Sequence, residues 1–153
     1  MEEGAGEEAV NTFVPFPDPA NSAAVLDRAR LGKQRVEALT LLRVLSGTQT
    51  GWRNHPATKM WAGHEGALAA YGLAICAEWV RRGYRDSCAE KIRDLADPDE
   101  NWPGWWGDEA VHRSHRSNLR RKDEAHYGKL WPDVPPDLPY VWPRPERTLE
   151  KKP

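Results

Sequence analysis

Apolar residues recur every three or four positions in several stretches of the chain, and this spacing is typical of helices with one buried face. In residues 22–46 the apolar face is formed by Leu31, Ala38, Leu42 and Leu45. No stretch shows the alternation of apolar and polar residues that a half-buried strand requires. The pattern predicts an all-α protein.

Capping and turn residues divide the chain into four predicted helices, over residues 22–46, 56–82, 87–95 and 109–125. Asn21 or Ser22 can cap the first helix, and Pro56 suits the first turn of the second. Gly83 can end the second helix in a left-handed conformation, and Asp108 can cap the last. Three main helices and a short one make a small bundle.

These helices predict a single domain, because 153 residues suit one hydrophobic core. Residues 1–10 are acidic and predict a disordered extension, and residues 11–142 form the predicted helical domain. The last part of that domain is rich in proline and aromatic residues, which predicts an irregular tail packed over the bundle. Residues 143–153 are predicted to be a flexible end.

Composition narrows the class of protein. No apolar run approaches the roughly 18 residues that a membrane-spanning helix needs, and residues 1–10 are too acidic for a signal peptide. The two cysteines, Cys76 and Cys88, do not make a disulfide framework. We therefore expect a soluble, cytoplasmic and monomeric protein with no membrane partner.

Positive charge gathers in two segments, although the formal net charge is −1. Residues 1–9 hold four glutamates and no base, and without them the formal charge is +3. Residues 28–35 form the first basic cluster, and residues 112–122, with five arginines and lysines and no acid, form the second. Such clustering is typical of phosphate-binding surfaces, but a solvated helix face gives the same pattern.

Helical spacing places Arg30, Lys33 and Glu37 along one stripe of the first helix. The two cations are expected to favour the ionised form of Glu37. Two interpretations are open. The stripe could hold a surface ion pair between Lys33 and Glu37, worth only about 0.2–0.5 kcal/mol, or it could bind an anionic ligand and act on it.

The histidines give no metal-binding pattern. His112 and His115 have the i, i+3 spacing that two metal ligands can use, but no cysteine or carboxylate completes a known ligand set. His64 falls on the apolar face of the second helix, where a histidine is usually a core residue, and His55 precedes the proline that starts this helix. We expect neither a metal nor a cofactor.

Basic and aromatic side chains late in the sequence could bind nucleic acid. The second basic cluster mixes arginines with serine, asparagine and histidine, which are short groups able to reach phosphate oxygens. Tryptophan in a small protein usually belongs to the core, but exposed aromatic rings can stack on bases. The candidates are Trp102, Trp105, Trp106, Tyr140 and Trp142.

The order of these motifs resembles that of the pyrimidine dimer DNA glycosylase and abasic-site lyase family, whose founding member is phage endonuclease V. A proline-rich arm precedes a helix with the pattern RL-x5-E, and NHP opens the next helix. A long helix ending in RRGY, a basic helix and an aromatic segment follow. The resemblance covers most of residues 11–142, and CAEWVRRGYRD is its closest local match.

The resemblance implies an all-α, bacterial or phage-encoded enzyme that binds double-stranded DNA and uses no metal. Enzymes of this family remove a damaged pyrimidine by attack of an amine on the anomeric carbon of the sugar. We therefore expect a DNA glycosylase, with or without lyase activity, that acts on a cyclobutane pyrimidine dimer or another altered pyrimidine. A non-catalytic nucleic-acid-binding helical module and a protein–protein adaptor are the alternatives.

The resemblance also implies roles for individual residues. Glu37 matches the essential glutamate of the family, which stabilises the cationic sugar and imine intermediate or moves a proton, and Arg30 stands where the founding member has a histidine. The expected DNA-binding residues are Arg30, Arg35, Arg53, Arg113, Arg116, Arg120 and Arg121. The expected pocket residues are His55, His64, Tyr140 and Trp142, of which the last two stand where the founding member has its lesion-contacting tail.

The family's nucleophile is the α-amino group of the mature N-terminus, whose pKa near 7.7–8.0 leaves a neutral fraction at pH 7. Here an acidic segment precedes the region of resemblance, and three alternatives are open. Translation could start at Val10, so that Asn11 supplies the amine. Lys33 could supply it, although its pKa would have to fall well below 10.4 beside a carboxylate. The amine chemistry could also be absent, which would leave a hydrolytic glycosylase or a binding protein.

Overall fold

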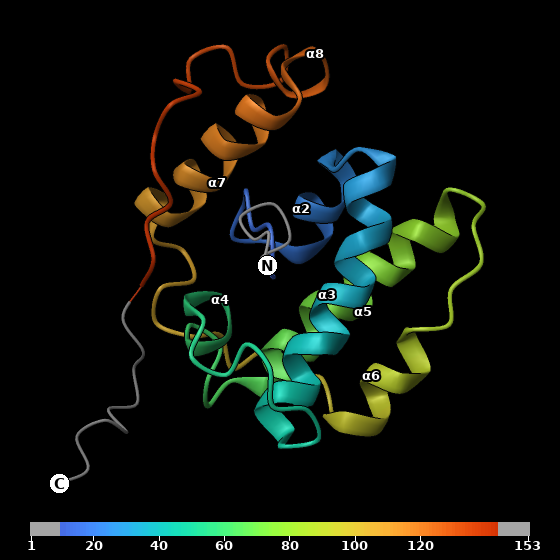
Figure 1. The fold of residues 1–153 in the computed structure, drawn as a ribbon. Coiled ribbons are helices and arrows are strands. Elements are labelled where there is room, and N and C mark those ends of the chain that lie inside the picture. Colours follow the sequence, from blue (N-terminus) through green and yellow to red (C-terminus); the bar gives the residue numbers. More distant parts are fainter. Residues whose placement is uncertain (1–9, 144–153) are drawn as a thin grey trace, which may run out of the picture.

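Helices make up the regular structure of residues 10–143, the part of the chain that the computed structural model describes. They are α2 (Pro19–Val25), α3 (Arg28–Ser46), α4 (Pro56–Lys59), α5 (Glu65–Arg81), α6 (Ala89–Leu95), α7 (Glu109–Lys122) and α8 (Glu124–Tyr127). Figure 1 shows their arrangement, with no strand among the described residues, so the all-α prediction is confirmed. No described helix is long and apolar enough to cross a membrane. The predicted extension and flexible end, apart from Val10 and Pro143, lie outside the described residues.

Helices α3 and α5 pack together at the centre of the bundle, and α2 and α6 pack against them (Figure 1). Small residues allow this close approach. A Cβ atom on Gly32 of α3 would lie 2.8 Å from the Trp79 ring, and one on Gly72 of α5 would lie 2.9 Å from the Ala38 side chain. The largest fully buried apolar side chains are those of Leu26, Leu31, Leu41, Leu42, Trp61, Leu68, Tyr71, Ile75, Ile92, Leu119 and Tyr127.

The predicted first helix, over residues 22–46, is two helices in the structure. Asp18 rather than Asn21 or Ser22 caps α2, and its carboxylate accepts a hydrogen bond from the backbone N–H of Asn21. Asp27 caps α3 in the same way by accepting from the N–H of Arg30. A continuous helix was therefore the wrong prediction, because a strong capping residue in its middle ends one helix and starts the next.

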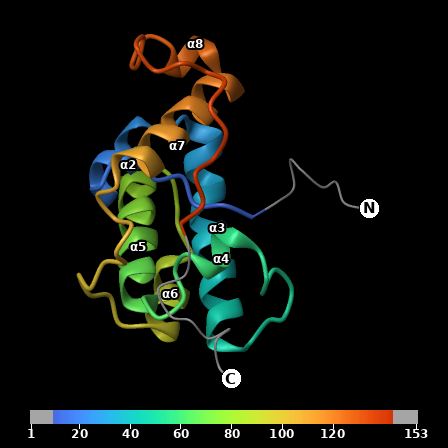
Figure 2. The same cartoon turned by 90° about the vertical axis from the view of Figure 1, so that its left-hand side faces the viewer.

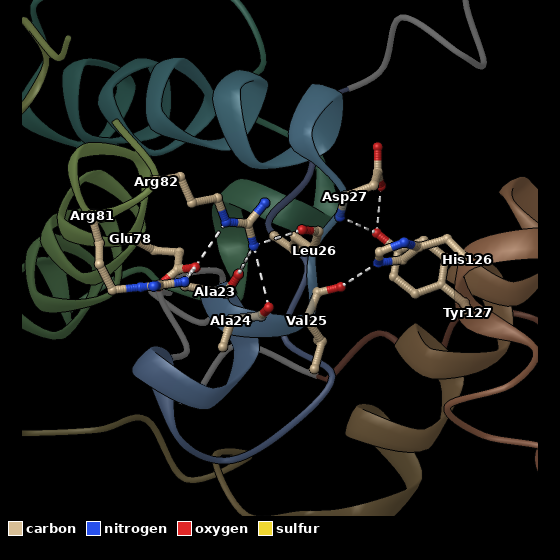
Figure 3. Close-up of polar contacts among 10 residues, drawn as sticks. All are labelled: Ala23, Ala24, Val25, Leu26, Asp27, Glu78, Arg81, Arg82, His126 and Tyr127. Atoms are coloured by element: carbon tan, nitrogen blue, oxygen red, sulfur yellow. Dashed lines mark hydrogen bonds and ion pairs between the residues drawn. The ribbon is translucent and has the colours of Figure 1, made fainter. Parts of the chain in front are cut away.

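Arg82 holds this break between α2 and α3 from the side of α5 (Figure 3). Its guanidinium pairs with Glu78 at 2.8 Å. It also donates to three carbonyl groups at the end of α2, those of Ala23, Ala24 and Leu26. One side chain thus provides partners for three of the carbonyl groups at this helix end.

Helix α8 holds the same break from the opposite side (Figure 3). The Tyr127 hydroxyl donates to the Asp27 carboxylate and accepts from the Asp27 N–H. The His126 ring bonds to the carbonyl of Val25 at 2.9 Å. The start of α3 is therefore fixed against both α5 and α8.

The predicted second helix, over residues 56–82, is also interrupted. Helix α4 ends at Lys59, a turn containing Gly63 at a φ of +84° follows, and α5 begins at Glu65. Tertiary contacts account for the turn, because Trp61 is buried in it and donates its indole N–H to the hydroxyl of Thr12. Gly83 follows the end of α5 with a φ of +100°, which is the left-handed helix stop that was predicted.

The last predicted helix, residues 109–125, ends three residues early in the structure. Asp108 caps α7 by accepting from the N–H of Ala110, as predicted. A second cap, Asp123, accepts from the N–H of His126 and starts the short helix α8. The short helix predicted at 87–95 is α6, which begins at Ala89.

The C-terminal tail runs back along α7 towards α4 (Figure 1). Two serine hydroxyls of α7 accept hydrogen bonds from backbone N–H groups of the tail. Ser117 accepts from Leu138, and Ser114 accepts from Val141. The rings of Tyr140 and Trp142 pack on the core. The prediction of an irregular tail packed over the bundle is confirmed.

Candidate active site

A cavity of about 580 Å³ lies where the N-terminal arm, α3 and the tail meet. It is lined by Val10, Asn11, Phe13, Ala29, Arg30, Lys33, Gln34, Glu37, His55, Lys122, Tyr140 and Trp142. The cavity therefore brings together the predicted catalytic residues and all the predicted pocket residues except His64. Its walls come from segments more than 100 residues apart in the sequence.

The contact at the centre of the cavity joins Asn11 to Glu37. The backbone N–H of Asn11 donates to Oε1 of Glu37 at 2.8 Å. The carbonyl of Asn11 accepts from the side-chain amide of Gln34, one turn earlier on α3, at 3.1 Å. Two side chains of α3 thus fix the nitrogen of Asn11 beside a carboxylate.

The arm that carries Asn11 is an extended segment between α3 and α7, as two views of the molecule show (Figures 1 and 2). Its backbone groups bond mainly to side chains. The N–H of Phe13 donates to the side chain of Gln34 at 2.9 Å, and its carbonyl accepts from the hydroxyl of Tyr71 at 2.7 Å. Since buried backbone groups need such partners, the arm is built into the core.

His112 and His115 of α7 clamp the next residue of the arm, Val14. Its N–H donates to Nδ1 of His115 at 3.2 Å, and its carbonyl accepts from Nδ1 of His112 at 2.7 Å. Nε2 of His112 accepts from the N–H of Gly107, so its Nδ1 carries the proton. Burial lowers the pKa of both rings, that of His115 to about 3. The i, i+3 spacing therefore lets both histidines bond to the backbone of Val14. No cluster that could hold a metal occurs among residues 10–143.

Arg116, one turn beyond His112, also binds the arm. Its side chain donates to the carbonyl of Pro15 at 2.7 Å and pairs with Glu109, and its guanidinium lies 5.8 Å from the ring of Phe16. Residues 10–16 are thus held from α3, α5 and α7 together. The result is that one atom, the nitrogen of Asn11, has a fixed place beside Glu37.

Comparison of the sequence with known protein families gives a match. The model of the pyrimidine dimer DNA glycosylase family matches residues 10–91, slightly more than half of the chain. The chain belongs to this family. The resemblance drawn from the sequence is confirmed, and membership implies a glycosylase whose substrate is DNA. No match is found among curated proteins or solved structures.

The family match begins at Val10, where the described structure also begins. It includes the arm, Glu37 and the whole of α5. Helix α7 and the tail lie beyond the matched region, although they supply the clamp on the arm and one wall of the cavity. In this glycosylase the site thus extends past the segment by which the family is recognised.

The electrostatics of Glu37 differ from the prediction. Burial raises the pKa of its carboxyl group, and the hydrogen bond from Asn11 and the charge of Lys33 lower it only in part, so the pKa stays raised. Lys33 does favour the ionised form of Glu37, as expected, but burial of the half-buried side chain outweighs this effect. A raised pKa makes a carboxylate a stronger base, which favours a role in proton transfer.

Three cationic side chains surround the cavity of this glycosylase. Arg30 and Lys33 come from α3, as predicted, and Lys122 comes from the end of α7. Burial lowers the pKa of Lys122, and the nearby charges of Arg30, Arg121 and Lys33 lower it further. The sequence placed Lys122 in the second basic cluster, but it gave no sign that the end of α7 reaches α3.

Aromatic rings form another wall of the cavity. The ring centroids of Tyr140 and Trp142 are 5.2 Å apart, and those of Trp142 and His55 are 5.9 Å apart. His55 caps α4 by accepting from the N–H of Ala57, and burial lowers its pKa. The other aromatic candidates belong to a second cluster, in which Trp105 and Trp106 contact the buried Trp61 and Trp102 stacks on Trp106.

Several predicted DNA-binding residues lie outside the cavity. Arg35 pairs with Asp86 at 2.7 Å and lies 4.6 Å from the centre of the Trp79 ring. Arg53 is exposed in the loop before α4, and Arg113 is half-buried on α7. The pocket candidate His64 bonds through Nδ1 to the carbonyl of Asn101.

Two arginines near the end of α7 hold the tail. Arg120 pairs with Glu124 and donates to the carbonyl of Val134 at 2.7 Å. Arg121 donates to the carbonyl of Pro136 and to the side chain of Asn118. Both guanidinium groups thus have partners within the fold, which basic patterning alone did not indicate.

Proposed function

We propose that this protein is a DNA glycosylase that excises a damaged pyrimidine from duplex DNA by attack of an α-amine at residue 11 on the anomeric carbon. The single observation that carries the proposal is the 2.8 Å contact between the nitrogen of Asn11 and the carboxylate of Glu37. Family membership supports the reaction class, and the cavity around this contact gives the substrate a place to bind.

The nucleophile requires a chain that begins at Asn11. A peptide nitrogen shares its lone pair with the adjacent carbonyl and cannot attack a sugar carbon, whereas a free α-amine with a pKa near 7.7–8.0 can do so. Translation from Val10 followed by loss of that first residue would produce this chain. The contacts along the arm support it, because they fix the atom that would become the amine.

The attack forms a bond between the amine nitrogen and the anomeric carbon as the bond from that carbon to the base breaks. The bonding electrons leave with the base, which takes up a proton, and the nitrogen loses a proton. The lone pair of the nitrogen then forms the imine bond as the bond from the anomeric carbon to the ring oxygen breaks, and that oxygen takes up a proton. Glu37 is placed to accept the proton that the nitrogen loses, and its carboxylate faces the positive charge of the intermediate. Its raised pKa favours the proton-transfer role.

The remaining cavity residues suit the substrate. Arg30, Lys33 and Lys122 present positive charge to DNA phosphates, and Tyr140 and Trp142 present rings to a base. Lys33, which also lines the cavity, is the alternative amine.

A trapping experiment tests the proposal. Chains covering residues 11–153 and 1–153 are incubated with duplexes that carry a cyclobutane dimer or an abasic site, with and without borohydride, which reduces an imine to a stable bond. We expect a covalent complex with the shorter chain and much less with the longer one. Glu37→Gln in the shorter chain should slow turnover about 100-fold or more while DNA affinity is kept. Glu90→Gln, an exposed carboxylate on α6, is the control.

The other outcomes identify the alternatives. Equal trapping by both chains would place the amine elsewhere, with Lys33 the first residue to replace. Base release without trapping would indicate a hydrolytic glycosylase. Duplex binding without base release by either chain would indicate a non-catalytic module.

A further inference from the structure

The loop before α4 holds a large aromatic residue in an unfavourable backbone conformation. Trp52 has a φ of +66°, and it is the only non-glycine residue with a positive φ in the described part of the chain. For a bulky side chain this left-handed conformation is strained. The neighbouring Gly51, which could adopt it without strain, does not have a positive φ.

Two hydrogen bonds fix this conformation. The carbonyl of Trp52 accepts from the N–H of His55 at 3.0 Å and from the hydroxyl of Thr58 at 2.8 Å. Thr58 is only 2% exposed, so the loop is anchored to a buried side chain of α4. The backbone at Trp52 is therefore held by the start of α4.

The Trp52 side chain is exposed, although it belongs to an aromatic row that begins in the cavity. Trp52 is 41% exposed, and its ring contacts His55 edge-on at 5.7 Å. His55 lines the cavity and contacts Trp142, which contacts Tyr140. The row thus runs from the cavity to the surface and ends in an exposed indole.

We propose that Trp52 is a stacking wedge, whose indole enters the base stack of duplex DNA beside the cavity and stacks on the base left without a neighbour. The inference rests on the proposed function, because a base must leave the helix before its sugar can be attacked. Proteins that open a duplex often insert an apolar side chain at the gap. Aromatic stacking is suited to this role since every base offers a flat face.

The strain supports a role in binding rather than in folding. Trp52 keeps 41% of its surface exposed, so the fold leaves a large part of the indole available for a ligand. Strained residues that are held by surrounding contacts gather at binding sites. A ring that already packs against a neighbouring side chain, as Trp52 does against His55, loses less conformational freedom when it binds than one without such a contact.

The test measures binding and needs no chemistry. The probe is a duplex with a tetrahydrofuran abasic-site analogue opposite 2-aminopurine, a base that fluoresces when it is unstacked from its neighbours, and the matched probe is the same duplex with every base paired. The proteins are the full chain and its variants Trp52→Ala, Trp52→Gly and Trp52→Phe. Leu130→Ala is the control, since Leu130 is exposed to the same degree, 42%, in the loop after α8.

We expect Trp52→Ala and Trp52→Gly to bind the abasic duplex about tenfold more weakly, which is the effect of losing one base–aromatic stack. Both should also change the fluorescence of the bound 2-aminopurine. Trp52→Phe should stay within about threefold of the original protein, and Leu130→Ala should have no effect. All the proteins should bind the fully paired duplex equally.

The glycine variant separates recognition from folding. Glycine adopts a positive φ without strain, so Trp52→Gly should melt at the same temperature or higher while binding the abasic duplex more weakly. If Trp52→Gly bound both duplexes more weakly to the same extent, or bound both as tightly as the original protein, the proposed role of Trp52 would be wrong. If trapping succeeds and Trp52→Gly binds normally, the wedge alone is wrong. If trapping fails and the selective loss is observed, the wedge stands and the amine chemistry is wrong.

Discussion

At the scale of single residues, Glu37 is subject to opposing influences that only the structure can weigh. Helical spacing was enough to place Glu37 beside Lys33 and to predict a stabilised charge. The arm lies 26 residues away in sequence and covers the carboxyl group, and burial then outweighs the cation. Periodicity within one helix carries no information about such a cover, which is why the sign of the pKa shift could not be predicted.

This shift has a consequence for stability. Because the pKa of Glu37 is higher in the folded protein than in the unfolded chain, the folded state retains a proton that the unfolded state releases. The contribution of this site is present below the usual pKa of a glutamate and is lost as the pH rises through the raised value. We therefore expect Glu37→Gln to be more stable than the original protein at about pH 8 and similar to it at about pH 4.

Thermal melting of both proteins across this pH range measures the difference. The control is Glu90→Gln, which should follow the original protein at every pH because Glu90 is exposed. A lower melting temperature for Glu37→Gln at about pH 8 would mean that the ionised carboxylate stabilises the fold.

At the scale of elements, the sequence predicted which regions are helical but not where the long helices break. The break at Asp27 is held by Arg82, more than 50 residues away, and by Tyr127, 100 residues away. The turn after α4 is held by Trp61, whose partner Thr12 lies in the arm. Local propensity favours continuous helices in both regions, and distant side chains decide otherwise.

Asp27 should therefore contribute measurably to stability. Burial raises the pKa of its carboxyl group, but the hydrogen bonds from Tyr127 and Arg30 outweigh this effect and leave the pKa lowered. Its stabilisation is present at neutral pH and is lost as the pH falls through the lowered value. We expect Asp27→Ala to lose about 1–2 kcal/mol at neutral pH, from the cap and the bond to Tyr127.

Urea denaturation at about pH 7 and at about pH 2.5 checks this expectation, because the difference between the two proteins should shrink at the lower pH. Asp94→Ala, an exposed residue of α6, is the control. An equal loss at both pH values would assign the effect to helix propensity rather than to the carboxylate.

At the scale of the whole molecule, the site is assembled from the arm, α3, the start of α4 and the two segments that follow the family match. The stripe of Arg30, Lys33 and Glu37 could be predicted because it lies within one helix. The contributions of Gln34 and Lys122 could not, since they depend on where the arm and the end of α7 lie. Arg116, which the sequence suggested for DNA, holds the arm instead of facing the cavity.

This assembly predicts which cations bind DNA. Lys122 lines the cavity and should contact a phosphate, so Lys122→Ala should weaken duplex binding about equally for all sequences. The slope of log affinity against log salt concentration should become shallower by about 1. Lys129→Ala, an exposed residue outside the cavity, is the control. An unchanged slope for Lys122→Ala would show that Lys122 makes no phosphate contact.

The clamp on Val14 also determines when the site can form during synthesis. The arm leaves the ribosome first, but its partner His115 is 101 residues further along the chain. Contacts between such distant residues form late and slow folding. Until α7 has emerged, the arm has no complete binding site and its nitrogen cannot be held beside Glu37. A nascent chain therefore carries α3 and Glu37 well before the arm can be fixed beside them, and the cavity assembles only after α7 has been synthesised.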